Sequence, residues 1–191
     1  MGGAYVSPAA VFLVNFCFGL YILAVLLRFL FQIVRADFYN PLSQAIVTIT
    51  NPPLRFIRRY VPALGKLDSA SLLLLLILQA VNTWLVLLIV GRGGAVGGVL
   101  VIALAELAQK TIYVFMFAIF IQIVIGWISP GTYNPITTLL DDLTHPLLAP
   151  ARRMVPPVGG LDFSPLIPIV GLNLLIFLLV APIRDLGYAL L

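Results

Sequence analysis

Four long apolar stretches constrain this chain more than any other feature. They lie at about residues 9–34, 71–90, 99–128 and 163–183. A helix needs about 20 apolar residues to cross a bilayer core, and in lipid a helix satisfies all of its own backbone polar groups. Hydrophobic residues make up 62% of the chain and charged residues 9%, which excludes a water-soluble domain. We therefore predict an all-α integral membrane protein with four transmembrane helices in a single membrane domain, residues 1–191.

The third stretch contains two charged residues near its start. Glu106 and Lys110 are one helical turn apart and can pair. Two charges in the middle of a membrane are costly, so we expect this pair at the membrane surface and residues 111–128 in the hydrocarbon. An interfacial salt bridge is one interpretation of the pair, and a coupled proton or ion site is the other.

An internal repeat organises the chain. When the sequence is shifted by 94 positions, 14 of the 34 residues from Tyr39 to Leu72 are identical to their counterparts. The identities include Pro, Gly, Arg and Asp, so a shared apolar composition does not explain them. We predict two parallel tandem repeats, at about 5–97 and 98–191. Each consists of a helix, a loop with amphipathic helices and a second helix, and a pseudo-two-fold axis along the membrane normal relates them.

Basic residues predict the orientation of the repeats. Two spans separate the two loops, so both loops lie on one side. That side holds seven basic residues: Arg35, Arg55, Arg58, Arg59, Lys66, Arg152 and Arg153. The other side holds three: Arg92, Lys110 and Arg184. Positive residues favour the cytoplasm, so we predict a multi-pass protein of the inner membrane with cytoplasmic loops and periplasmic termini.

Asn-Pro pairs in both loops predict helix starts, because Asn caps a helix and Pro suits its first turn. The clearest pairs are Asn40-Pro41 and Asn134-Pro135. Asn51-Pro52 and His145-Pro146 predict a second short helix in each loop, and Pro62 and Pro156 end these second helices. All four helices are too short to span the membrane, so we expect them in the headgroup plane.

The second helix of each loop carries paired arginines, Arg58-Arg59 and Arg152-Arg153. Parallel repeats predict that these four side chains form one basic face around the pseudo-two-fold axis. That face either anchors the loops to anionic lipid headgroups or binds a protein partner or an anionic ligand. Asp68 and Asp162, which precede the second span of each repeat, are expected to cap those spans or to pair with the arginines.

Several polar residues lie within the predicted spans. Gln79 and Asn173 occupy equivalent positions in the two repeats, Gln122 lies in the third span, and Arg28 lies about two turns from the loop end of the first. Such residues either hydrogen-bond between helices inside the bundle or line a permeation path. Arg28 is expected either to extend to the headgroups or to contact an anion.

The motifs of metal, nucleotide and nucleophilic enzymes are absent from the sequence. Cys17 and His145 are the only residues of their types. We therefore predict a protein that is not an enzyme, has no cofactor or metal and does not bind nucleic acid directly. The sequence does not indicate an oligomeric state.

The loops resemble those of the bacterial YggT family, also called YlmG. The resemblance rests on Asp37-Phe38-Tyr39-Asn40-Pro41, Arg58-Arg59-Tyr60-Val61-Pro62 and Lys66-Leu67-Asp68, and on their counterparts in the second half. It implies a small multi-span protein of the inner membrane, associated with osmotic tolerance and cation uptake. Relatives are associated with cell division, nucleoid placement and cytochrome assembly.

Two functions follow as hypotheses. The first is a scaffold or assembly factor whose basic amphipathic loops recruit a membrane or cytoplasmic protein. The alternative is a solute or cation pathway, or a transport accessory, involved in osmotic tolerance. The first is favoured because identity between the repeats is concentrated in the loops rather than in the spans.

The predicted topology can be tested with reporter fusions. A reporter fused after Leu191 is expected to be active only as a periplasmic enzyme, and one inserted near Lys66 only as a cytoplasmic one, because the basic residues hold the loops inside. The opposite pattern would overturn the orientation.

Overall fold

The computed structural model describes residues 3–62, 68–128, 134–155 and 162–191, and all regular secondary structure in these ranges is helical. The elements are α1 (Gly3–Val34), α2 (Pro41–Arg58), α3 (Ser69–Ile89), α4 (Val96–Ile128), α5 (Pro135–Met154), α6 (Leu166–Leu175), η1 (Ile176–Val180) and α7 (Ala181–Ala189). Four segments are long and apolar enough to cross a membrane: Ser7–Val34, Ser69–Ile89, Val96–Ile128 and Leu166–Ala189. The prediction of an all-helical protein with four spans is confirmed.

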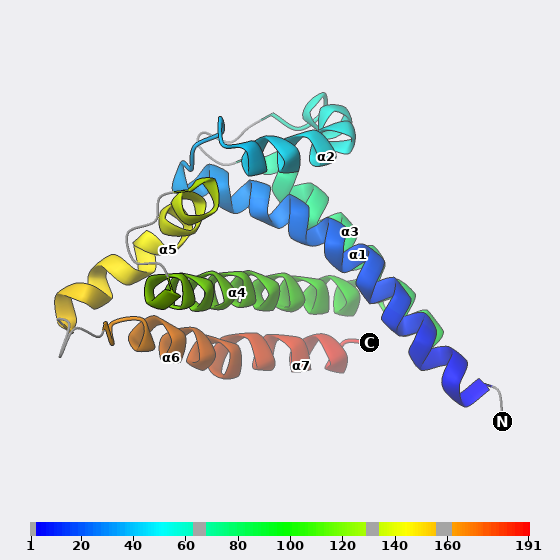
Figure 1. Ribbon diagram of the computed structural model, residues 1–191. Coiled ribbons are helices and arrows are strands. Elements are labelled where there is room, and N and C mark those ends of the chain that lie inside the picture. The colour runs from blue at the N-terminus through cyan, green and yellow to red at the C-terminus, as the bar shows by residue number, and fades with distance from the viewer. Residues whose placement is uncertain (1–2, 63–67, 129–133, 156–161) are drawn as a thin grey trace.

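The order of elements repeats along the chain. Helix α1 packs against α3, and α4 packs against the continuous α6–η1–α7 segment. The loop helices α2 and α5 lie at one end of the spans, whereas both chain ends lie at the other (Figure 1). The π-helical turn η1 comes just before Pro182, where a widened turn accommodates a ring that would clash with the preceding turn.

The two halves meet unequally. Helix α3 packs against α4, but among the described residues α1 shows no comparable packing against α6 or α7. A groove of about 380 Å³ is lined by apolar side chains of α1, α2, α4 and α5. An apolar groove therefore separates α1 from α4 beside the loop helices.

Each loop forms one long helix rather than the two short helices that we expected. Helix α2 runs through Pro52 and Pro53, and α5 runs through Pro146 and Pro150. Both helices change direction along their length (Figure 1), as helices do at an internal proline. The prolines therefore bend these helices without ending them.

The loop helices also pack onto the spans. Leu54 and its repeat counterpart Leu148 are fully buried, each within an apolar cluster shared with the spans. Both side chains therefore contact the protein rather than the lipid around it. This burial holds both loop helices against the bundle.

The start of the third span differs from our expectation. Helix α4 is continuous from Val96 to Ile128, and the Glu106 carboxylate accepts hydrogen bonds from Gln79 and Thr83 in the middle of α3. Glu106 therefore lies level with the middle of α3 rather than with its end. The carboxylate is half-buried, and this position is tolerated because α3 supplies donors and Lys110 Nζ lies 3.9 Å from Glu106 Oε2.

Two glycines allow α4 and α7 to approach closely. A Cβ at Gly187 would lie 2.9 Å from the backbone nitrogen of Ile102, and a Cβ at Gly98 would lie 2.9 Å from the Gly187 carbonyl oxygen. Small residues at such crossings let helix backbones pack against each other in membranes. The fourth span is therefore held at its far end by backbone contact.

We predict that Gly187→Ala destabilises the protein by about 1–3 kcal/mol, because the new methyl group has no room. The measurement is the thermal unfolding midpoint of the purified protein in detergent. Gly171→Ala is the matched control, since nothing lies within 4 Å of a Cβ at that position. Equal effects of the two substitutions would contradict the assigned contact.

Candidate functional site at the loop end of the spans

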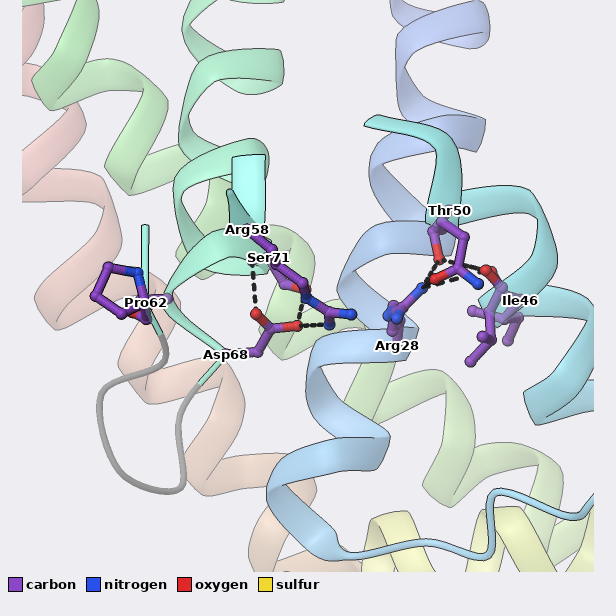
Figure 2. Close-up of polar contacts among 10 residues, drawn as sticks. Arg28, Ile46, Thr50, Arg58, Pro62, Asp68 and Ser71 are labelled. Carbon is purple, nitrogen blue, oxygen red and sulfur yellow. Dashed lines mark hydrogen bonds and ion pairs between the residues drawn. The ribbon is translucent and has the colours of Figure 1, made fainter. Parts of the chain in front are cut away.

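Arg28 joins the first span to its loop helix (Figure 2). The side chain is buried, and its Nη1 donates hydrogen bonds to Thr50 Oγ1 at 2.8 Å, Asn51 Oδ1 at 3.0 Å and the Val47 carbonyl oxygen at 3.2 Å. Arg28 is therefore buried against its own loop helix and does not extend away from the protein, whereas its contact with an anion stays a prediction. It binds the polar side of α2 just before the two prolines.

The second repeat makes the same junction with different chemistry. Gln122 occupies the position 94 residues after Arg28, and Thr144 is the counterpart of Thr50. Thr144 Oγ1 donates to Gln122 Oε1 at 2.5 Å, and Gln122 Nε2 donates to the Asp141 carboxylate. In both repeats, a polar side chain of the first span thus holds a buried threonine of the loop helix.

An arginine–aspartate pair ties the end of each loop helix to the start of the next span. Arg58 pairs with Asp68 (Figure 2), and Arg152 Nε lies 3.3 Å from Asp162 Oδ2. The two pairs differ in exposure, since the Asp68 side chain is 5% exposed and the Asp162 side chain 40%. The carboxylate of the first pair is therefore removed from solvent although Arg58 is partly exposed, and both members of the second pair are exposed.

Asp68 also caps α3. Its Oδ1 accepts from the Ser71 amide at 3.4 Å and its Oδ2 from Ser71 Oγ at 2.7 Å. Burial by itself raises the pKa of the Asp68 carboxyl, but hydrogen bonds from Arg58 and Ser71 outweigh it and hold that pKa below its usual value. Pro62 contributes a carbonyl that accepts from Ser69 Oγ at 2.6 Å.

The loop helices start side by side and end far apart. Asn40 caps α2 and Asn134 caps α5, in each case before a proline at the first helical position, Pro41 or Pro135. Asn40 Nδ2 also donates to the Pro135 carbonyl oxygen at 2.6 Å. From this contact α2 and α5 run in different directions (Figure 1).

We expected the four arginines to form one basic face around the axis, but they do not. Arg58 and Arg59 lie at the far end of α2, and Arg152 and Arg153 lie at the far end of α5. The structure instead presents two separate basic ends, each with one arginine paired to an aspartate. Pro156 lies outside the described residues.

The polar residues inside the spans mostly contact one another. Asn82 Nδ2 donates to Asn15 Oδ1 at 3.1 Å, and fully buried Gln79 binds Glu106. Asn173 Nδ2 donates to the Ile169 carbonyl oxygen at 2.8 Å within its own helix. Within the described ranges, no three His, Cys, Asp or Glu side chains come together as a metal site.

The Arg28–Thr50 junction was not predicted, although a signal for it existed. Thr50 and Thr144 are among the identities between the repeats, and Arg28 and Gln122 share the same offset of 94 residues. Pairing two polar positions that recur at a common offset would have indicated the contact. Identity between the repeats links loops with loops and spans with spans, and by itself it does not reveal contacts between a loop and a span.

Comparison with known proteins supports the repeat. The sequence model of the CCB3/YggT family matches twice, at residues 7–89 and 101–183, and the two matches are offset by the same 94 positions. A Pseudomonas aeruginosa protein is 40% identical over 176 residues, covering 91% of this chain and 89% of its own length. YggT of Escherichia coli K12 is 38% identical over 157 residues, covering 82% and 81%. No solved structure matches the chain significantly.

We predict that Asp68→Asn lowers the free energy of unfolding by about 2 kcal/mol, because Arg58 loses its charged partner and a neutral amide replaces the buried carboxylate that accepts from Arg58 and Ser71. Asp162→Asn, the matched change in the exposed pair, is expected to cost about 0–1 kcal/mol. Thermal unfolding in detergent measures both, and equal losses would contradict the difference in burial.

The contribution of Asp68 to the stability of the fold depends on pH in a definite direction. Because the pKa of Asp68 is lowered in the folded state, its stabilising contribution is complete above about pH 4, the ordinary pKa of an unfolded aspartate. The contribution is lost as the pH falls through the lower folded pKa. In acid, the difference in stability between the wild-type protein and Asp68→Asn should therefore shrink.

Proposed function

The chain belongs to the CCB3/YggT family, and from the geometry of its loops we propose that it is a non-enzymatic scaffold or assembly factor of the inner membrane. In this proposal the loops face the cytoplasm, both termini are periplasmic, and the basic ends of α2 and α5 bind a protein partner. Anionic lipid headgroups supply secondary anchoring.

One observation carries the proposal: both loop helices are fixed to the spans by buried polar contacts that recur in the two repeats. Thr50 and Thr144 are fully buried, and each is held by a side chain of the preceding span. Lipid anchoring alone requires charge but no such fixed geometry. A helix held in one orientation presents its outer side chains at defined positions, as recognition of a partner requires.

The outer side chains have suitable chemistry. Arg59 and Arg153 are exposed and directly follow the arginines that pair with aspartates. A guanidinium binds carboxylate or phosphate groups with two parallel hydrogen bonds. The basic ends of α2 and α5 therefore suit acidic segments of a partner. Arg58 and Arg152, which pair with aspartates, hold these ends in place.

A cation pathway is the second candidate, and Glu106 is the observation that favours it. A carboxylate at mid-depth in a membrane is a functional candidate by default. However, Glu106 contacts Gln79, Thr83 and Lys110, and the groove between α1 and α4 is lined by apolar side chains. These contacts favour a structural role for Glu106.

The scaffold proposal can be tested by crosslinking in cells. A photoreactive amino acid at position 59 or 153 is expected to capture a specific protein, and one at the lipid-facing position 178 is not. Charge reversal at both sites, Arg59→Glu with Arg153→Glu, should weaken capture by a neighbouring probe roughly ten-fold, because the guanidiniums contribute directly.

Arg92→Glu is the matched control, since Arg92 is exposed at the opposite end of the spans. Growth under osmotic stress provides the cellular measurement. Cation flux through the purified protein in liposomes that is abolished by Glu106→Gln, with no protein captured at 59 or 153, would overturn the scaffold in favour of the pathway.

A further inference from the structure

At the loop end of the first repeat, the Asp68 carboxylate is surrounded by charged and hydrogen-bonding groups of the chain itself. Arg28 is close enough to interact electrostatically with Arg58 and Asp68, and Figure 2 shows the three side chains at one level. Ser71 adds a hydroxyl donor to the same carboxylate. Asp68 thus receives donors from the chain itself and is almost fully buried.

The second repeat differs at two of these positions. Gln122 stands in place of Arg28, and Pro165 stands in place of Ser71. Asp162 contacts Arg152 and accepts a hydrogen bond from the Ser164 amide at 2.9 Å, and its side chain is 40% exposed. A carboxylate that is enclosed in one repeat is therefore accessible in the other.

A cavity lies where the missing groups would be. Its volume is about 190 Å³, and its polar wall is formed by Gln122, Arg152 and Asp162. Trp127, whose side chain is 72% exposed, lies at its edge, and Ile123 contributes to the apolar wall. Tryptophan is typical of the headgroup level of a bilayer, so the cavity opens where lipid headgroups meet acyl chains.

The charge of the two sites also differs. Arg28, Arg58 and Asp68 together carry one net positive charge. In the second repeat, Gln122 is neutral and binds Asp141, whose counterpart in the first repeat is the apolar Val47. With Arg152 and Asp162, that site carries one net negative charge, so the second repeat lacks a cation that the first repeat supplies internally.

We propose that this cavity binds the headgroup of a zwitterionic phospholipid bearing a primary ammonium. The ammonium supplies the missing cation, donating hydrogen bonds to Asp162 and lying against the face of Trp127. The adjoining phosphate pairs with Arg152, and the acyl chains follow the apolar wall. This proposal stands independently of the scaffold function.

Ligand chemistry distinguishes this proposal from general lipid contact. A primary ammonium has three N–H donors, whereas a trimethylated ammonium has none. A lipid that offers only a phosphate would meet Arg152 but would add negative charge beside Asp162 and Asp141. The site should therefore discriminate between headgroups on bilayers of otherwise equal composition.

The test is a lipid titration of the purified, detergent-solubilised protein followed by native mass spectrometry. Dioleoylphosphatidylethanolamine is expected to bind roughly ten-fold more tightly than dioleoylphosphatidylcholine or dioleoylphosphatidylglycerol, the difference made by a hydrogen bond to a charged group. Gln122→Arg, which restores the chemistry of the first repeat, should abolish this preference while the protein stays folded. Asp162→Asn should also abolish the preference for phosphatidylethanolamine.

Asp185→Asn is the matched control, because it removes an exposed carboxylate at the other end of the same span. That variant should retain the full preference. Equal binding of the three lipids to the wild-type protein would overturn the proposal, as would tighter binding of phosphatidylglycerol. A preference that survives in folded Gln122→Arg would overturn it as well, because it would place the ethanolamine elsewhere.

Discussion

The fold depends on one requirement: a polar group removed from water must have a partner within the protein. Threonines in the loop helices meet this requirement through side chains of the spans, Arg28 in one repeat and Gln122 in the other. These contacts come directly before prolines that bend α2 and α5. The orientation of each loop helix is thus fixed from within the membrane, and the positions of the arginines follow from it.

The two repeats share the residues that form these contacts but differ in side chains near them. The identical residues are those that shape the backbone or form its supports: Asn at the helix start, Thr at the junction, and Arg with Asp at the end. Two residues near the aspartate differ between the halves: Arg28 is replaced by Gln122, and Ser71 is replaced by Pro165. The aspartate at the loop end is therefore buried in the first repeat and exposed in the second, although the backbone arrangement is the same.

The spans and the caps could be predicted from sequence because each depends on local composition or on a short motif. Contacts between elements could not. A charged residue in a membrane and a proline inside a helix are each costly when considered alone, so the sequence predicts Glu106 at the surface and Pro52 at a helix start. In the structure Glu106 has partners on another helix, Gln79 and Thr83, and α2 continues through Pro52. The divergence of α2 and α5 likewise depends on three-dimensional bending that no sequence spacing reveals.

The position of Glu106 has a consequence for how the chain enters the membrane. A carboxylate at the centre of a lone α4 would cost about 2.5–3.5 kcal/mol in lipid, and its donors Gln79 and Thr83 belong to the preceding span. Only residues 90–95 separate α3 from α4, so the two helices are able to pair as soon as both have been synthesised. They are therefore expected to leave the translocon together as a hairpin, with α3 retained at the lateral gate until its partner arrives.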